Sequence, residues 1–218
     1  MILRIGWAVQ LISPLIPVVA AGVGYRSTLY IRRPWMNRLS ITLLYILLVN
    51  WLLLATAMNH IQNNWMYNAS VIPEFALSLW TLSGIGPRPI PTFVLGPAPV
   101  GILGIAILQW LKMGPWEMWP MVILYSITVL FALCIWRLAR IIPLIVEDPD
   151  TWQPAFWLLG SWMLMNGVDL AFWPLFDYFL ARLSRPLVLV PFLMKFILGM
   201  FFNLALARTF LCRKSHSS

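Results

Sequence analysis

Charged side chains are scarce in this sequence. Only 10% of its 218 residues are Asp, Glu, Lys or Arg, and 61% are hydrophobic, whereas a soluble domain carries roughly 25% charged residues. No polar run is long enough to form a soluble domain beside the apolar segments. The composition therefore excludes an ordinary soluble protein and predicts an all-α fold, a polytopic bundle of membrane-spanning helices.

Cysteine and histidine are scarcer still. Cys134 lies inside an apolar segment and Cys212 in the C-terminal tail, so we expect neither a disulfide framework nor a CxxC site. His60 and His216 lie far apart, and neither has an HxxxH partner. We therefore expect no metal and no cofactor. The formal charge of +8 does not indicate nucleic acid, because the basic residues cluster at the ends of apolar segments, as in membrane proteins.

The apolar runs predict one integral membrane domain, residues 1–218, with seven spans at about 5–23, 41–58, 71–93, 100–111, 121–138, 154–174 and 187–206. The polar, asparagine-rich stretch 60–70 is expected to be an aqueous loop. Glycines and prolines interrupt residues 84–91. The third segment is therefore either a short, broken span or a re-entrant piece, which is tolerated only against protein or a cavity.

Basic residues favour seven spans over six. Seven spans with an external N-terminus place ten Lys and Arg inside and four outside, whereas omitting the third span places seven on each side. We therefore expect the C-terminus in the cytosol, with the protein in the endoplasmic reticulum membrane of a eukaryote or otherwise in the inner or plasma membrane. The same topology puts Asn68, in an Asn-Ala-Ser sequon, on the outer or lumenal side as a candidate glycosylation site.

The stretch 153–174 is the most informative part of the chain, because it carries a single charge over more than twenty residues. Trp162, Asn166, Asp169 and Trp173 are spaced by four, three and four residues. This spacing places them on one face of an α-helix. A carboxylate inside a membrane is costly, so Asp169 is expected to face the protein interior and to have a partner or a function.

Glu74 and Asp169 are the two acids that fall within predicted spans. A carboxyl group in a low dielectric favours its neutral form, and a neutral acid can protonate an alkene or an epoxide. Aromatic faces can stabilise the resulting carbocation by cation–π attraction, worth about 2 kcal/mol for a desolvated contact. We therefore take Asp169 and Glu74 as candidate catalytic residues, and the candidate substrate-binding residues are Trp162, Asn166, Trp173, Trp51 and Trp157.

Lys195 offers a different role for Asp169. Lys195 lies nine residues after Pro186, and Asp169 lies eight residues before Asp177, so the two reach similar depths on consecutive antiparallel helices. An ion pair would keep Asp169 charged and make it a poor proton donor. The sequence leaves both roles open.

Short motifs in the back half of the chain resemble the membrane-bound, seven-helix terpene cyclases of fungal meroterpenoid pathways. They are Gly114-Pro115, Tyr125-Ser126, Leu133-Cys134, Leu159-Gly160-Ser161, Trp173-Pro174 and Pro186-Leu187-Val188-Leu189, and in the front half Tyr25, Tyr30 and Asn50-Trp51 are similar. The resemblance implies a seven-helix fold and acid-initiated cyclisation.

The chain departs from the family in two places. Residues 52–54 and 195–203 contain no acid where the family carries one, so a catalytic acid here would have moved to Asp169 or Glu74.

Three functions remain in competition. The first is a terpene cyclase or isomerase acting on a lipophilic prenyl substrate, with the lipid bilayer as its surroundings and no nucleic acid partner. The second is a transporter or channel in which Asp169, Lys195 and the broken third segment line a polar path. The third is a non-catalytic subunit of a membrane complex, whose polar residues join helices. The first is our working hypothesis because it accounts for the many aromatic residues, for the helix face that carries Asp169, and for the resemblance.

Overall fold

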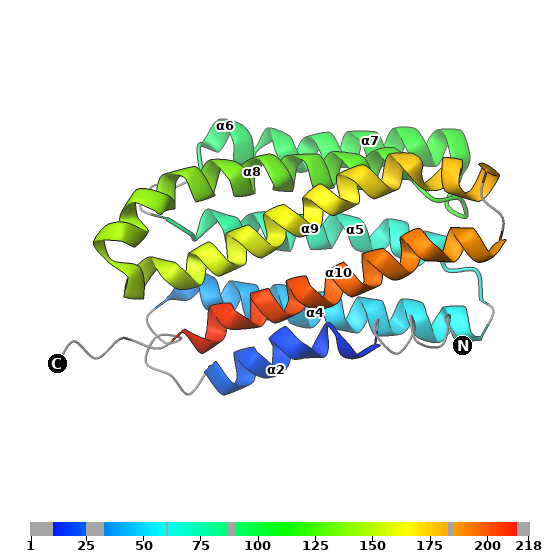
Figure 1. The fold of residues 1–218 in the computed structure, drawn as a ribbon. Coiled ribbons are helices and arrows are strands. Elements are labelled where there is room, and N and C mark those ends of the chain that lie inside the picture. The colour runs from blue at the N-terminus through cyan, green and yellow to red at the C-terminus, as the bar shows by residue number, and fades with distance from the viewer. Residues whose placement is uncertain (1–10, 25–32, 60, 87–89, 183–184, 213–218) are drawn as a thin grey trace.

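The computed structural model describes residues 11–24, 33–59, 61–86, 90–182 and 185–212. These residues form helices joined by short connections, with no strand in the described ranges, so the all-α prediction is confirmed (Figure 1). The helices are α2 (Leu15–Gly24), α4 (Pro34–Met58), α5 (Asn64–Ser83), α6 (Thr92–Leu95), α7 (Pro97–Met113), α8 (Pro120–Glu147), α9 (Pro149–Arg182) and α10 (Arg185–Leu211).

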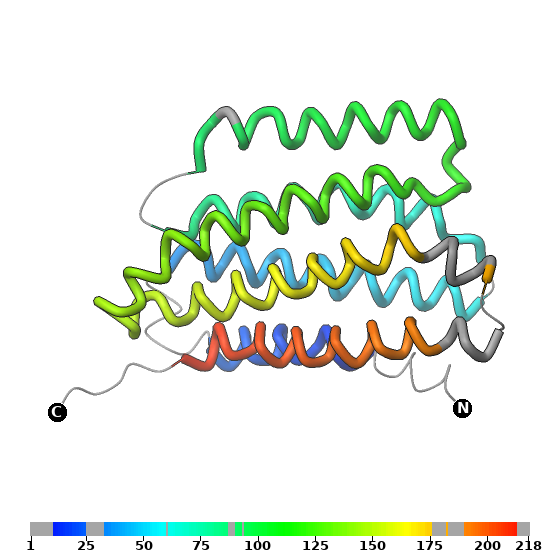
Figure 2. Tube along the Cα trace, turned by 45° about the horizontal axis from the view of Figure 1, so that its top comes forward, coloured from blue at the N-terminus to red at the C-terminus, as the bar shows by residue number. Residues whose placement is uncertain are grey.

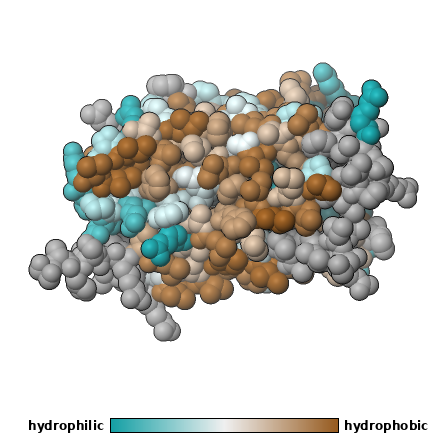
Figure 3. Space-filling model, viewed as in Figure 1, coloured by the Kyte–Doolittle hydropathy of each residue, from teal (hydrophilic) through white to brown (hydrophobic). Residues whose placement is uncertain are grey.

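Four of these helices are long and apolar enough to cross a membrane: α4, α8, the Pro149–Leu175 part of α9 and the Val190–Leu211 part of α10. Helices α2 and α7 are apolar but shorter. The molecular surface agrees with this character, because hydrophobic side chains cover the middle of the visible face and hydrophilic ones gather toward its two ends (Figure 3). A surface of this kind suits contact with lipid chains along the helices and with water at their ends.

The long helices lie side by side and alternate in direction along the chain (Figures 1 and 2). Helix α8 packs on α9, α9 on α10, α10 on α2, and α4 on α5, while α5 also contacts α8. Helix α7 lies on the outside of the bundle, against α8 (Figure 2). The centre between these helices is filled by fully buried apolar side chains, among them Leu39, Leu82, Val122, Leu158 and Leu159.

The third segment begins earlier than the sequence predicts. Helix α5 starts at Asn64, so most of the stretch 60–70, expected as an aqueous loop, is helical. The prediction failed because the polar residues there are satisfied within the protein. Asn68 and Ser70 are buried, and their side chains donate hydrogen bonds to the backbone oxygens of Glu117 and Tyr67.

The expected break after the third segment is present. Helix α5 ends at Ser83, and Gly86 adopts a φ of 95°, a left-handed conformation that glycine accepts without steric cost. A side chain at Gly86 would also approach the guanidinium of Arg137, whose Nη1 lies 3.0 Å from the ideal Cβ position. The short helix α6 and then α7 follow this irregular stretch, so α5 and α7 are separate antiparallel helices (Figure 1).

The other helices extend beyond the predicted spans. Helix α8 continues through Pro143 to Glu147, and α9 runs through Pro154 and Pro174 to Arg182. Pro154 is the sixth residue of α9, and the Asp150 carbonyl oxygen, which its missing N–H would bond, accepts a hydrogen bond of 3.2 Å from the Arg33 Nη2 instead. Asp148 links the two helices, because its Oδ1 accepts a hydrogen bond of 3.1 Å from the Thr151 N–H and so caps the start of α9.

Candidate functional site

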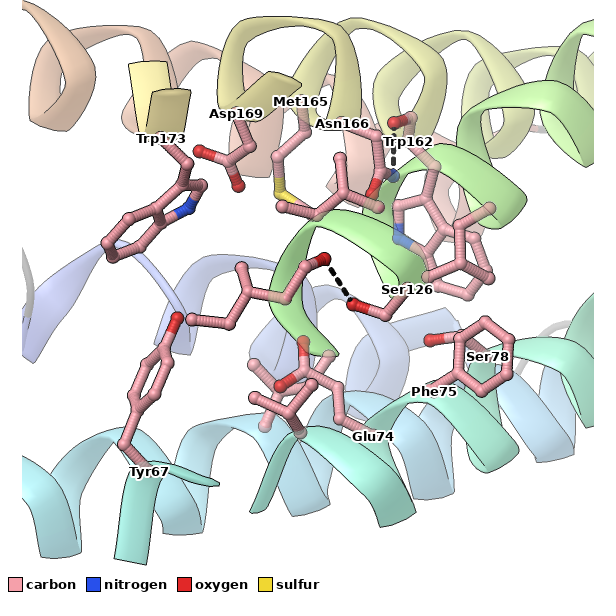
Figure 4. Close-up of a pocket in the computed structure, with 15 residues that line it drawn as sticks. Tyr67, Glu74, Phe75, Ser78, Ser126, Trp162, Met165, Asn166, Asp169 and Trp173 are labelled. Atoms are coloured by element: carbon pink, nitrogen blue, oxygen red, sulfur yellow. Dashed lines mark hydrogen bonds between the residues drawn. The ribbon is translucent and has the colours of Figure 1, made fainter. Parts of the chain in front are cut away.

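A cavity of about 90 Å³ lies in the bundle between α5, α8 and α9 (Figure 4). Its wall is formed by fifteen residues that combine polar groups with aromatic rings: Ile46, Tyr67, Val71, Glu74, Phe75, Ser78, Ile123, Ser126, Ile127, Leu130, Trp162, Met165, Asn166, Asp169 and Trp173. We refer to it as the acid cavity, because both of the predicted catalytic acids line it.

Helix α9 presents the face that its sequence spacing predicts. Trp162, Asn166, Asp169 and Trp173 all line the acid cavity. Trp162 and Asn166 are buried, and the Asn166 Nδ2 donates to the Trp162 backbone oxygen at 2.7 Å (Figure 4). This hydrogen bond fixes the carboxamide on its own helix, one turn from Asp169.

Glu74 enters the same cavity from the opposite side, on α5 (Figure 4). Tyr67, Val71, Glu74, Phe75 and Ser78 all line the cavity and share one face of this helix, because their spacing follows the helical repeat. Among the residues that the structure describes, none donates a hydrogen bond to the Glu74 carboxyl group or forms an ion pair with it. An acid without a cation in apolar surroundings favours its neutral, proton-carrying form.

Asp169 is in a different electrostatic environment. Its Oδ1 lies 2.7 Å from the Nζ of Lys195 on α10, so the ion pair that the sequence left open is formed. The same ammonium group lies over two aromatic rings, 4.7 Å from the centroid of Phe172 and 4.6 Å from that of Trp173. Asp169 therefore has a cationic partner, whereas Glu74 has none among the residues that the structure describes.

A larger cavity of about 340 Å³ adjoins the acid cavity on the side of α2 and α10. Four residues line both cavities: Tyr67, Met165, Asp169 and Trp173. The remainder of its wall is mostly apolar and rich in phenylalanine, and includes Phe172, Phe192, Phe196 and Phe202. We call it the aromatic cavity. Its volume falls in the range of small-molecule sites, roughly 300–1,000 Å³, whereas the acid cavity has room only for one end of such a molecule.

Two predicted substrate-binding residues lie elsewhere. Trp51 is 39% exposed, lines neither cavity, and donates from Nε1 to the Leu11 backbone oxygen at 3.3 Å. Trp157 lines a separate hollow near the junction of α8 and α9, with Gln153 and Phe156. It is five residues from Trp162, about 140° around the helix, so it cannot share that face. We predicted Trp51 and Trp157 as substrate-binding residues because both are tryptophans inside apolar runs. A position inside an apolar run does not determine which way the side chain points.

Tyr67 and Phe75 are site residues that sequence reasoning missed. Tyr67 lies seven residues, about two turns, before Glu74, and Phe75 follows Glu74 directly; both line the acid cavity from α5. A periodic reading of residues 64–83 would have found Tyr67, but the stretch 60–70 was assigned to a loop because of its asparagines. Figure 4 shows Tyr67 and Glu74 rising from α5 toward the side chains that descend from α9.

Asn68 is not placed to accept a glycan. Its side chain is only 2% exposed, and its Nδ2 donates to the Glu117 backbone oxygen at 2.6 Å while its Oδ1 accepts from the Trp119 N–H at 3.0 Å. These bonds fasten α5 to the connection between α7 and α8. The sequon at Asn68 therefore coincides with a structural amide, which contradicts its prediction as a glycosylation site.

Comparisons of the chain with models of protein families, with curated proteins and with solved structures give no match. The resemblance to seven-helix terpene cyclases therefore rests on the short motifs alone. Some of the residues in those motifs lie at the cavities: Ser126 and Trp173 line the acid cavity, and Asn50 lines the aromatic cavity.

Proposed function

We propose that this protein is a membrane-embedded cyclase or isomerase that acts on a lipophilic prenyl substrate, with Glu74 as the proton donor and Asp169 as the proton acceptor. One observation carries the proposal. An acid without a cationic partner and a carboxylate paired with Lys195 line the same aromatic-walled cavity. Two carboxyl groups in different electrostatic surroundings within one pocket are an arrangement that acid–base catalysis uses.

The proposed reaction conserves atoms and charge. Glu74 transfers its proton to a terminal alkene carbon, which forms a C–H bond and leaves a carbocation on the neighbouring carbon; with an epoxide, the proton goes to oxygen and a C–O bond breaks. Attack by a second alkene of the same chain closes a ring and moves the cation. A final C–H bond then breaks, its proton goes to the Asp169 carboxylate, and its electrons form a double bond. The product is an isomer of the substrate.

The aromatic residues of the cavity stabilise the cation between these two proton transfers. Phe75, Trp162 and Trp173 line the space between Glu74 and Asp169, and an aromatic face attracts a cation by about 0.5–2 kcal/mol, depending on desolvation. The small volume also leaves little room for water beside the reacting end, and water would capture the carbocation as an alcohol.

We further propose that α2, α4, α5, α7, α8, α9 and α10 all belong to segments that cross the membrane, with the C-terminus in the cytosol. The alternating direction of the helices supports this count (Figure 1). The described arginines at the end where α4 begins and α10 ends are Arg33, Arg38, Arg137, Arg140 and Arg208, whereas the opposite end carries Lys112, Arg182 and Arg185. This asymmetry agrees with the positive-inside rule.

The decisive experiment compares Glu74→Gln with Glu117→Gln in protein reconstituted into nanodiscs. The substrates are a prenylated epoxide and the corresponding polyene. Glu117 is an exposed acid between α7 and α8, so its variant controls for loss of a carboxyl group. We expect Glu74→Gln to fold normally and to lose about 10²–10⁴-fold in cyclisation rate, the usual contribution of a general acid. In enzyme equilibrated in D₂O beforehand, the cyclised polyene of the first turnover should carry one deuterium on the carbon that was protonated. Full activity of Glu74→Gln contradicts the proposal.

The transporter or channel hypothesis has one observation in its favour, namely that the two neighbouring cavities share Asp169, whose partner Lys195 lines the aromatic cavity. Charged residues inside a bundle of membrane helices also occur along substrate paths in transporters. Reconstituted liposomes separate the two functions. Ion or solute flux that depends on Asp169 and Lys195, together with no conversion of either prenyl substrate, would favour transport.

A further inference from the structure

Tyr67 occupies a position that the proposed reaction does not explain. It lines the acid cavity, the aromatic cavity and a third cavity of about 230 Å³, and it is the one residue common to all three of these walls. The third cavity and the acid cavity share no other lining residue. Tyr67 therefore stands between them.

The third cavity has the character of an entrance for water. It lies at the end of the bundle where α4 passes into α5, and its wall includes Ala57, Asn63 and Asn64 together with Asn50 from deeper in α4. The nearby residues Asn59, Ile61 and Gln62 are exposed. Three carboxamides and a volume equal to several water molecules, at about 30 Å³ each, suit occupation by water. We call this cavity the vestibule.

The ring and the hydroxyl of Tyr67 have separate surroundings. The ring packs against Trp173, with centroids 6.3 Å apart and an angle of 49° between the planes. The hydroxyl points from α5 toward Asp169 and Trp173 (Figure 4), within electrostatic range of both Glu74 and Asp169. No other described residue makes a hydrogen bond with it. A phenol is both a donor and an acceptor, so this hydroxyl can serve either carboxyl group.

We propose that Tyr67 is the barrier that keeps vestibule water out of the acid cavity, and that its hydroxyl returns the proton from Asp169 to Glu74 after each reaction. In the return step, protonated Asp169 gives its proton to the Tyr67 oxygen while the Tyr67 hydroxyl gives its own proton to the Glu74 carboxylate. The tyrosine ends unchanged, Asp169 is again a carboxylate beside Lys195, and Glu74 is again a neutral acid.

The two parts of this inference have different foundations. The return of the proton rests on the proposed function, because it needs Glu74 and Asp169 to exchange protons with a substrate. The barrier rests only on the positions of the cavities. An experiment on water access can therefore succeed or fail whether or not the protein is a cyclase.

Water access is measured by the rate at which a charged methanethiosulfonate, the 2-sulfonatoethyl reagent, modifies single cysteines in nanodiscs. The background is Cys134→Ser with Cys212→Ser. Ser126→Cys reports on the acid cavity, since Ser126 is buried and lines it, and Ala57→Cys reports on the vestibule. We expect rapid labelling of Ala57→Cys and very slow labelling of Ser126→Cys. Adding Tyr67→Ala should raise the rate at Ser126→Cys several-fold without changing the rate at Ala57→Cys.

Tyr45→Ala is the matched control, because Tyr45 lines none of the three cavities and its hydroxyl donates to the Ser70 backbone oxygen. It should leave labelling of Ser126→Cys unchanged. Three results would overturn the barrier: equally rapid labelling of Ser126→Cys with Tyr67 present, no increase with Tyr67→Ala, or an equal increase with Tyr45→Ala. Failure to label Ala57→Cys would show that the vestibule holds no water from the aqueous phase.

Tyr67→Phe isolates the hydroxyl. The ring remains, so Ser126→Cys should stay protected in this variant. With the prenyl substrates, the first turnover should proceed at the normal rate, because Glu74 starts with its proton, and the steady-state rate should fall because Glu74 regains it slowly. If Tyr67→Phe changes neither the first turnover nor the later ones, the proposed return of the proton through Tyr67 is wrong. That result would not contradict the proposed catalytic roles of Glu74 and Asp169.

Discussion

The Lys195 ammonium lies 2.7 Å from the Asp169 carboxylate and at the same time over the ring of Trp173, with Nζ 4.6 Å from the ring centroid. These three groups join α9 to α10 at the wall shared by the acid cavity and the aromatic cavity. The pair therefore has a structural effect and a chemical one. It joins two helices, and in the proposed reaction the Asp169 carboxylate beside Lys195 is the group that receives the proton.

Single and double neutralisation of the pair separate these effects. Asp169→Asn or Lys195→Met alone should lower stability by roughly 1–3 kcal/mol, less than a fully buried pair loses, because both side chains keep part of their exposure. The double variant should recover most of the yield and the thermal unfolding temperature in detergent. It should not recover cyclisation, because no carboxylate remains to accept the proton. Full activity of the double variant would show that Asp169 has only a structural role.

Asn68 should contribute to stability and carry no glycan. Asn68→Ala removes hydrogen bonds to the backbone of Glu117 and Trp119 and leaves the buried Trp119 N–H without its partner, which costs about 1–3 kcal/mol. Asn59 is exposed and bonds only to its own helix, so Asn59→Ala should change stability by less than about 0.5 kcal/mol. Thermal unfolding measures the difference. A glycosidase-sensitive mass shift that Asn68→Gln abolishes would contradict the buried position.

Gly101 and Gly104 on α7 form a second matched pair. An added Cβ at Gly101 would lie 2.3 Å from the Tyr125 hydroxyl oxygen, which bonds to the Ala98 backbone oxygen, whereas a Cβ at Gly104 would meet nothing within 4 Å. Gly101→Ala should therefore push α7 away from α8 and cost about 1–3 kcal/mol. Gly104→Ala should be neutral or stabilise by up to about 1 kcal/mol, because alanine favours the helix. Equal effects of the two variants would argue against the close contact of α7 with α8.

The seven-span topology can be tested with reporters. A reporter after Ser218 and a tag between residues 26 and 32 should both lie in the cytosol. Six crossings separate these two positions, by α4, α5, α7, α8, α9 and α10, and an even number of crossings returns the chain to the same side. A cysteine at Gln62 should be labelled from the outer or lumenal side, since Gln62 is exposed at the opposite end of the bundle. An external C-terminal reporter with a cytosolic tag would mean that one of the helices does not cross.

Local sequence patterns determined the elements of this protein and part of the site. Scarce charge and long apolar runs dictate helices, because a backbone in lipid must satisfy its hydrogen bonds internally. The four-three-four spacing from Trp162 to Trp173 determined that one face of α9 lines a cavity. Counting residues back from the turn placed Asp169 and Lys195 at one depth, and the structure pairs them. Each of these inferences needs only one helix or two consecutive ones.

Only the tertiary structure decided which faces meet. Glu74 and Asp169 are 95 residues apart in the sequence, and they share a cavity because α5 and α9 both pack around α8. The same packing buries Asn68 under the α7–α8 connection and turns Trp51 and Trp157 away from the site. Helical periodicity fixes which residues point together, but the direction of a face depends on side-chain packing between segments distant in sequence. That packing also places Tyr67 in the walls of three neighbouring cavities.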